Sequence, residues 1–199
     1  MNNQVETSVE VSLTERDRFS VALRLILILP ALLFIASFAE FTAIAKGVSL
    51  GGFFFFPALL ALVFTGKYPS YVYEFHKAFF SLNLRANVYF FLLTDEYPTI
   101  ENNPSFQVQL PEIEGGSKLN RGMPLIKWFI AIPLYVVGLI YLAVSILLTI
   151  YAWIFILITG KYPEPVANFV VGTLAFWNRV HGYSLLLVTD EYPTFSNSL

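Results

Sequence analysis

The chain has 199 residues, of which 56% are hydrophobic and only 13% are charged, whereas a soluble domain carries about 25% charged residues. Its mean hydropathy is +0.64, and one small core cannot hide so much apolar surface, so the composition predicts contact with lipid. The net charge of −2 gives no electrostatic reason to expect nucleic-acid binding, and the lack of cysteine excludes disulfides and thiolate chemistry.

Two short stretches, residues 9–13 and 106–110, alternate apolar and polar side chains. A period of two is typical of a half-buried β-strand. Two isolated strands are marginal alone, but these two could pair with each other outside the bilayer.

Two apolar runs are long enough for membrane helices. Residues 25–66 carry only two charges, Glu40 and Lys46, and the sequence KGVSLGG breaks the run near its middle. Residues 128–158 carry no charge, and as one helix they would be about 46 Å long against a hydrocarbon core of roughly 30 Å. We therefore expect this second run to tilt, enter the interface or break, with Pro133 as the kink.

Two polar phrases each occur twice, in the same order. TGKYP spans residues 65–69 and 159–163, and TDEYPT spans residues 94–99 and 189–194. The two copies of TGKYP are 94 residues apart, whereas the matching residues upstream of them are 103 apart, so the first copy carries nine extra residues. We place these in KGVSLGG and interpret the pattern as an internal duplication.

The pattern predicts an all-α integral membrane protein built as a tandem repeat. Each repeat would hold about two membrane helices, about four in total, with a short extramembrane β-strand before each repeat. The expected parts are a polar N-terminal segment with a strand at 1–18, a first membrane repeat at 19–100, a linker with a strand at 101–118, and a second repeat with a short C-terminal tail at 119–199.

TGKYP is expected to close an apolar helix. Gly66 and Gly160 can adopt the left-handed conformation that ends a helix, and Lys67 and Lys161 favour the negative end of its dipole. The lysine stems can reach lipid headgroups, and tyrosine suits the aromatic belt of a membrane. A structural, interfacial role therefore accounts for the whole phrase.

TDEYPT places acids after helical runs, where they oppose the helix dipole and need partners, water or a place that caps whatever follows. These acids are Asp95, Glu96, Asp190 and Glu191. The basic residues considered as their partners are Lys67, Lys161, Arg85 and Arg179. Two adjacent carboxylates supply too few oxygens for a hard cation, so we expect ion pairs or headgroup contacts rather than a metal site.

The segments between the phrases, residues 71–93 and 166–188, leave two alternatives open. They are long enough to cross the bilayer with a polar face turned inward, and they could also lie along the interface. Arg85 and Arg179 occupy aligned positions in them, and an arginine inside a membrane is costly unless it is paired.

No catalytic pattern is present in the sequence. It contains no HExxH, no GxSxG and no phosphate loop, and neither histidine belongs to a repeated pair or a ligand-spaced motif. We therefore expect a non-enzymatic protein with no catalytic residues, no cofactor and no metal.

The segments LNRGMPLIKWFIAIP and WIFILITGKYPEPVANFVVGTLAFWNRVHGYSLLLVTDEYPTF closely resemble the bacterial membrane family known only as domain of unknown function 4389. That family shows a basic-tryptophan start running into Ile-Pro, an apolar run ending in TG-basic-YP, an FxVG stretch with an arginine, and a final TD-x-YP-x-F. Residues 119–195 match nearly throughout. Residues 19–100 resemble a second, more divergent copy that lacks FxVG. The resemblance implies a bacterial integral membrane protein and no activity.

Basic residues precede both apolar runs, which favours the cytoplasmic side for both starts. They are Arg16, Arg18 and Arg24 before the first, and Lys118, Arg121 and Lys127 before the second. Two crossings per repeat then predict a multi-pass protein of the bacterial cytoplasmic (inner) membrane with both termini inside. If the helices after TGKYP lie flat instead, the repeats are inverted.

Three functions remain as hypotheses. The first is an accessory or scaffolding subunit that contacts the lipid bilayer and either other membrane proteins or itself. The second is a small transporter or channel, which a duplicated unit would permit and which needs polar residues converging at mid-membrane. The third is a lipid-acting membrane enzyme with TDEYPT as an acidic site, which needs a base or metal cluster that the sequence does not offer.

Overall fold

The computed structural model describes residues 3–39, 41–42, 49–50, 56–101 and 103–198. Its helices are α1 (Arg18–Ala22), α2 (Arg24–Leu27), α3 (Leu29–Ala39), α4 (Phe56–Thr65), α5 (Ser70–Phe90), α6 (Lys127–Ile130), α7 (Ile132–Thr159) and α8 (Glu164–Ser184). Its strands are β1 (Glu6–Val9), β2 (Phe41–Thr42), β3 (Ser49–Leu50) and β4 (Phe106–Gln109), and short 3₁₀ turns occupy Glu114–Gly116 and Met123–Leu125.

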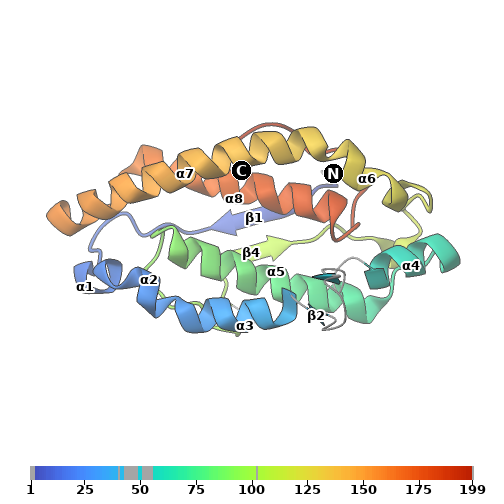
Figure 1. The fold of residues 1–199 in the computed structure, drawn as a ribbon, viewed down its shortest axis with the longest axis horizontal. Coiled ribbons are helices and arrows are strands. Elements are labelled where there is room, and N and C mark those ends of the chain that lie inside the picture. The colour runs from blue at the N-terminus through green and yellow to red at the C-terminus, as the bar shows by residue number, and fades with distance from the viewer. Residues whose placement is uncertain (1–2, 40, 43–48, 51–55, 102, 199) are drawn as a thin grey trace.

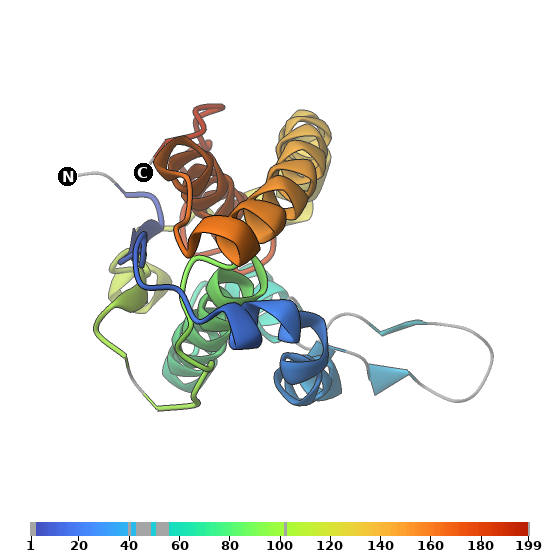
Figure 2. The same ribbon diagram turned by 90° about the vertical axis from the view of Figure 1, so that its left-hand side faces the viewer.

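The elements form three layers that run in nearly the same direction. Figure 1 shows α7, α8, β1, β4, α5 and α3 extending along the long axis of the molecule. Seen along that axis in Figure 2, β1 and β4 lie on one side and α7 and α3 on the other, with α8 and α5 between them. The contacts agree, because β4 packs on α5, β1 packs on α8, and α7 packs on both α8 and α1.

β1, near the N-terminus, pairs with β4, which lies near the middle of the chain. β1 and β4 are antiparallel, with Val9 opposite Phe106 and Thr7 opposite Val108. β4 lies within the alternating stretch at residues 106–110, whereas β1 ends at Val9, where the alternating stretch at residues 9–13 begins. A second pair, β2 with β3, forms a separate two-stranded sheet.

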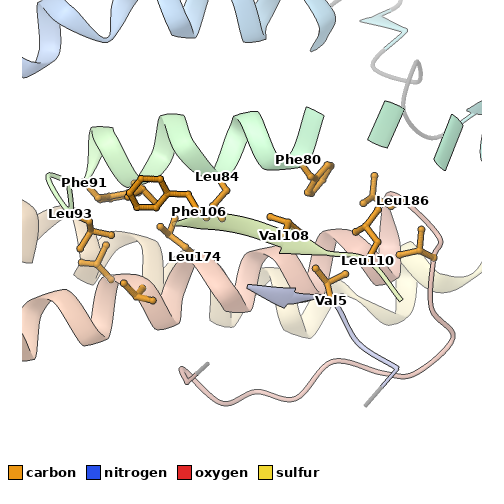
Figure 3. Close-up of a cluster of buried hydrophobic side chains, with 14 of the residues drawn as sticks. Val5, Phe80, Leu84, Phe91, Leu93, Phe106, Val108, Leu110, Leu174 and Leu186 are labelled. Carbon is orange, nitrogen blue, oxygen red and sulfur yellow. The ribbon is translucent and has the colours of Figure 1, made fainter. Parts of the chain in front are cut away.

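The main hydrophobic core lies where the sheet meets α5 and α8 (Figure 3). Phe106 and Val108 of β4 point into it, together with Leu84 of α5 and Leu174 of α8. The turns that follow the two helices close its ends, so both halves of the chain contribute to one core.

The structure corrects the prediction of an all-α integral membrane protein with about four membrane helices, which is wrong. Among the described residues only α7 is long and apolar enough to cross a membrane, and Arg24–Ser37 and Phe56–Thr65 are apolar but too short. α5 and α8 have 10 and 14 buried residues out of 21, because they form the middle layer and the core. Length and polarity could not distinguish such core helices from membrane helices.

The predicted break at KGVSLGG lies mostly outside the described residues. Glu40 and residues 43–48 and 51–55 lie outside the described residues. The second apolar run does break near its start, where α6 ends at Ile130 and α7 begins with Pro133 in its first turn.

Candidate functional site

The TDEYPT acid of the first half is held by two buried arginines, and we call this group the first clamp. Asp95 Oδ1 lies 2.9 Å from Arg16 Nη2 and 2.5 Å from Arg24 Nη2. The side chains of Arg16 and Arg24 are 0% and 2% exposed. The second carboxylate oxygen of Asp95 accepts the backbone N–H of Asp17, so both oxygens have partners.

The TDEYPT acid of the second half has a matching arrangement with a lysine, which we call the second clamp. Lys127 Nζ lies 2.6 Å from Asp190 Oδ1, and the lysine side chain is 0% exposed. Asp190 Oδ2 accepts the backbone N–H of Asn120. The same ammonium also donates to the carbonyl of Thr189, at 2.8 Å.

The equivalence extends to the surroundings of each cation. Arg24 Nη1 donates to the carbonyl of Thr94, as Lys127 does to that of Thr189. The Arg24 guanidinium lies 3.8 Å from the ring centroid of Tyr89, and the Lys127 ammonium lies 5.2 Å from that of Tyr183. Burial lowers the pKa of Lys127, while the hydrogen bond and charge of Asp190 act in the opposite direction.

The other residues singled out in the sequence lie elsewhere. Lys67 and Lys161 are exposed, and neither pairs with the repeated aspartates. Glu96 accepts from Asn103 Nδ2, and Glu191 accepts from Gln4 Nε2.

Arg85 and Arg179 hold the chain that follows each TDEYPT. Arg85 Nη2 donates to the carbonyl of Ile100, and Arg179 donates to the carbonyls of Ser196 and Ser198. Burial lowers the pKa of both arginines. The two residues therefore occupy equivalent places, and the contacts they make are with backbone carbonyls.

Sequence reasoning missed Arg16, Arg24 and Lys127 as the partners of the two acids. The signal was present, because Arg24 aligns with Lys127 at the 103-residue spacing and each cation stands at the start of an apolar helix. These basic residues were interpreted only as markers of membrane orientation.

The TGKYP tyrosines connect the two halves. Tyr68 Oη donates to the carbonyl of Leu186 at 2.7 Å, and Tyr162 Oη donates to the carbonyl of Phe91 at 3.2 Å. Each tyrosine thus reaches from its own half to the turn that follows the long helix of the other half. Burial raises the pKa of both phenols, so they stay protonated donors.

The histidines are placed within the helical layers. His76 Nδ1 lies 2.9 Å from Tyr68 Oη. The ring of His181 lies against Trp177 and Phe80, with centroids 5.2 and 6.0 Å away, and burial lowers its pKa to about 4. Within the described residues no group of three His, Cys, Asp or Glu side chains could hold a metal ion.

The outer layer presents an apolar face, which we define by the exposed side chains of α7 and Arg24–Ser37. In the most apolar window of α7 only 17% of the residues are buried. Leu139 is 59% exposed and Leu147 is 68% exposed, and Leu25 and Leu33 add to the face from the shorter apolar segment. A helix in the core of a soluble protein would be mostly buried, whereas α7 presents an apolar surface that the described residues leave uncovered.

Comparisons with known proteins agree in part with the expected resemblance. No curated protein and no solved structure matches the chain. The matched part contains α6, α7, α8 and the Lys127–Asp190 ion pair, whereas the first half lies outside it. Residues 123–197 match the model of the family described as domain of unknown function (DUF4389), so this part of the chain is similar to that family.

Proposed function

We propose that this protein is a non-enzymatic accessory or scaffolding subunit of a membrane protein complex, and that its apolar face lies within one leaflet of the bilayer. The observation that carries the proposal is the exposure of α7, whose large apolar side chains the described residues leave between 37% and 70% exposed on its outer surface. In the bacterial setting implied by the resemblance, the membrane would be the cytoplasmic one.

The direction of the layers favours a helix lying in the membrane plane. α7 has 28 residues and is therefore about 42 Å long, more than the roughly 30 Å of the hydrocarbon core. β1 and β4 run alongside it (Figure 1), so an upright α7 would carry polar strand residues such as Gln107 and Gln109 to membrane depth. With α7 in the plane, the sheet on the opposite side faces water.

The arrangement of the polar groups favours a scaffold over a transporter. A transport path would need Arg85 and Arg179 to converge at mid-membrane. Each instead binds backbone carbonyls that follow its own TDEYPT.

We also propose that the matching contacts of the two halves reflect two copies of one ancestral unit, joined by the crossing tyrosines into one rigid body.

The membrane part of the proposal is tested by placing charge on the apolar face. We expect Leu147→Arg to weaken flotation of the purified protein with phospholipid vesicles, because arginine in hydrocarbon costs about 2.5–3.5 kcal/mol, which is more than tenfold in binding. The matched control is Gln109→Arg on the sheet side, which should float as the unaltered chain does. Equal flotation of both variants would contradict the assigned face.

The subunit part is tested by purifying the native protein in mild detergent and identifying what co-purifies by mass spectrometry. A membrane protein recovered at fixed stoichiometry supports the proposal and names the complex. Recovery of only a monomer or a homo-oligomer argues against an accessory role. The membrane attachment would then be judged by the flotation experiment alone.

A further inference from the structure

An apolar cavity of about 390 Å³ opens between α1–α2, the end of α5 and α7. Its walls include Ala22 and Leu25 on one side and Ile150 and Trp153 on the other, and its floor includes Phe91. The indole N–H of Trp153 donates to the carbonyl of Val21, which joins the two walls. The volume lies within the roughly 300–1,000 Å³ typical of small-molecule pockets.

The lining gives the cavity an apolar character. Its polar members, Arg24 and Thr149, use their groups elsewhere: Arg24 in the first clamp and Thr149 in a hydrogen bond to the carbonyl of Ser145. Apolar cavities exclude water and accept apolar ligands. The ligand should therefore present hydrocarbon to this site.

The mouth of the cavity is continuous with the apolar face. Leu25, Ile150 and Trp153 line the cavity and are 69%, 54% and 39% exposed. If the apolar face lies in the bilayer, as we propose for the function, the cavity opens into hydrocarbon. An acyl chain could then enter it from the membrane without crossing water.

Two exposed cations lie beyond the cavity lining along the chain, one at the start of α1 and one just after the end of α7. Arg18 lies one helical turn before Val21 and Ala22, and its Nη2 would be 3.5 Å from a Cβ built on Gly160. Lys161 follows that glycine directly and is also exposed. Neither cation forms an ion pair with a described residue, so both are available to an anionic headgroup.

We infer that this cavity binds one acyl chain of an anionic phospholipid whose phosphate contacts Arg18 and Lys161. The inference rests on the proposed membrane attachment for the route of entry, while the binding itself depends only on the cavity and the two cations. The bound lipid would fill the space between α1–α2 and α7 and would tie the first clamp to the membrane surface.

The test is native mass spectrometry of the full chain in mild detergent, titrated with phosphatidylglycerol. We expect one tightly bound lipid per chain in the unaltered protein. Ala22→Phe, which fills the cavity from an exposed position, should reduce occupancy by about tenfold or more, since a lost 1.4 kcal/mol already gives that factor. The matched control, Ala143→Phe on the exposed surface of α7 outside the cavity, should retain the lipid.

The headgroup is tested with phosphatidylcholine and with Arg18→Gln and Lys161→Gln. Each substitution should weaken phosphatidylglycerol about fivefold, since one basic residue contributes about 1 kcal/mol to contact with an anionic lipid surface. Phosphatidylcholine should be weakened less, because its choline cation offsets the charge of its phosphate. Oleate provides the third arm, and tighter binding of oleate than of phosphatidylglycerol would overturn the phospholipid assignment.

The outcomes separate this inference from the proposed function. Unchanged occupancy in Ala22→Phe, or no retained lipid in a chain that still floats with vesicles, overturns the acyl site alone. Failure to float together with a one-to-one lipid complex in detergent overturns the membrane attachment and leaves the site standing. Circular dichroism and the Tm of each variant verify that it is folded.

Discussion

The two clamps hold equivalent acids, yet only one uses a cation that can lose its charge. Arginine stays protonated in proteins, whereas a buried lysine can release its proton. We therefore expect Asp95→Asn, which leaves Arg16 and Arg24 charged and buried, to lower the free energy of unfolding by about 3–5 kcal/mol. Asp190→Asn should cost less, because Lys127 can become neutral.

The pH dependence of the two variants distinguishes this account from a general loss of packing. Without Asp190, nothing opposes the burial that lowers the pKa of Lys127 in the folded chain. At alkaline pH the unfolded chain then binds more protons than the folded chain does. The free energy of unfolding therefore rises with pH, up to the pKa of lysine in the unfolded chain. The Tm deficit of Asp190→Asn should therefore shrink between pH 7 and pH 9.5, while that of Asp95→Asn should not. Glu191→Gln is the control at an exposed acid, and parallel pH profiles for the two aspartate variants would refute the argument.

At the scale of elements, α7 and α8 meet closely at a glycine. A Cβ built on Gly138 would lie 2.8 Å from Trp177 Cζ2 and 3.0 Å from Phe176 Cε1. Helix propensity alone predicts that Gly138→Ala stabilises the protein by about 1 kcal/mol, whereas the contact predicts overpacking that costs about 1–3 kcal/mol. We expect the contact to dominate, because both neighbours are bulky rings packed between helices.

The measurement for this contact is the Tm of Gly138→Ala against that of Gly122→Ala. A Cβ on Gly122 would have its nearest neighbour, Asn120 Oδ1, at 3.6 Å, which is ordinary contact. Gly138→Ala should melt at a lower temperature than the unaltered chain, and Gly122→Ala should not. A higher Tm for Gly138→Ala would show that α7 can move away from α8 at little cost.

Local sequence signals predicted where helices end but not what the helices pack against. α4 and α7 end at Thr65 and Thr159, and the glycines after them have φ values of 67° and 72°, as TGKYP indicates. The four-helix membrane prediction failed because periodicity describes one helix at a time and cannot tell whether α5 and α8 face lipid or a sheet. The repeat aligned Arg24 with Lys127, but spacing along the chain could not show which acid each cation meets, because contacts such as that of Asp95 with Arg16 span 79 residues.

At the scale of the molecule, the crossing tyrosines make each half depend on the other. Leu92 and Leu187 have φ values of 63° and 60°, a left-handed conformation that costs a non-glycine residue roughly 1–2 kcal/mol. The adjacent carbonyls of Phe91 and Leu186 are the acceptors of Tyr162 and Tyr68. Each strained turn is therefore held by a phenol from the opposite half.

Removing one of these hydroxyls should consequently loosen the half that was not changed. Tyr68→Phe leaves the carbonyl of Leu186 without this donor, which costs about 1–3 kcal/mol, and should speed hydrogen exchange of the amides at residues 185–188 by about tenfold. Tyr73→Phe is the matched control, because its hydroxyl donates to Leu110 and Pro111. If Tyr68→Phe sped the hydrogen exchange only of amides near residue 68, the two halves would contact each other without unfolding as one cooperative unit. A change at residues 185–188 would mean that the tyrosine of the first TGKYP stabilises the turn after α8 in the second half.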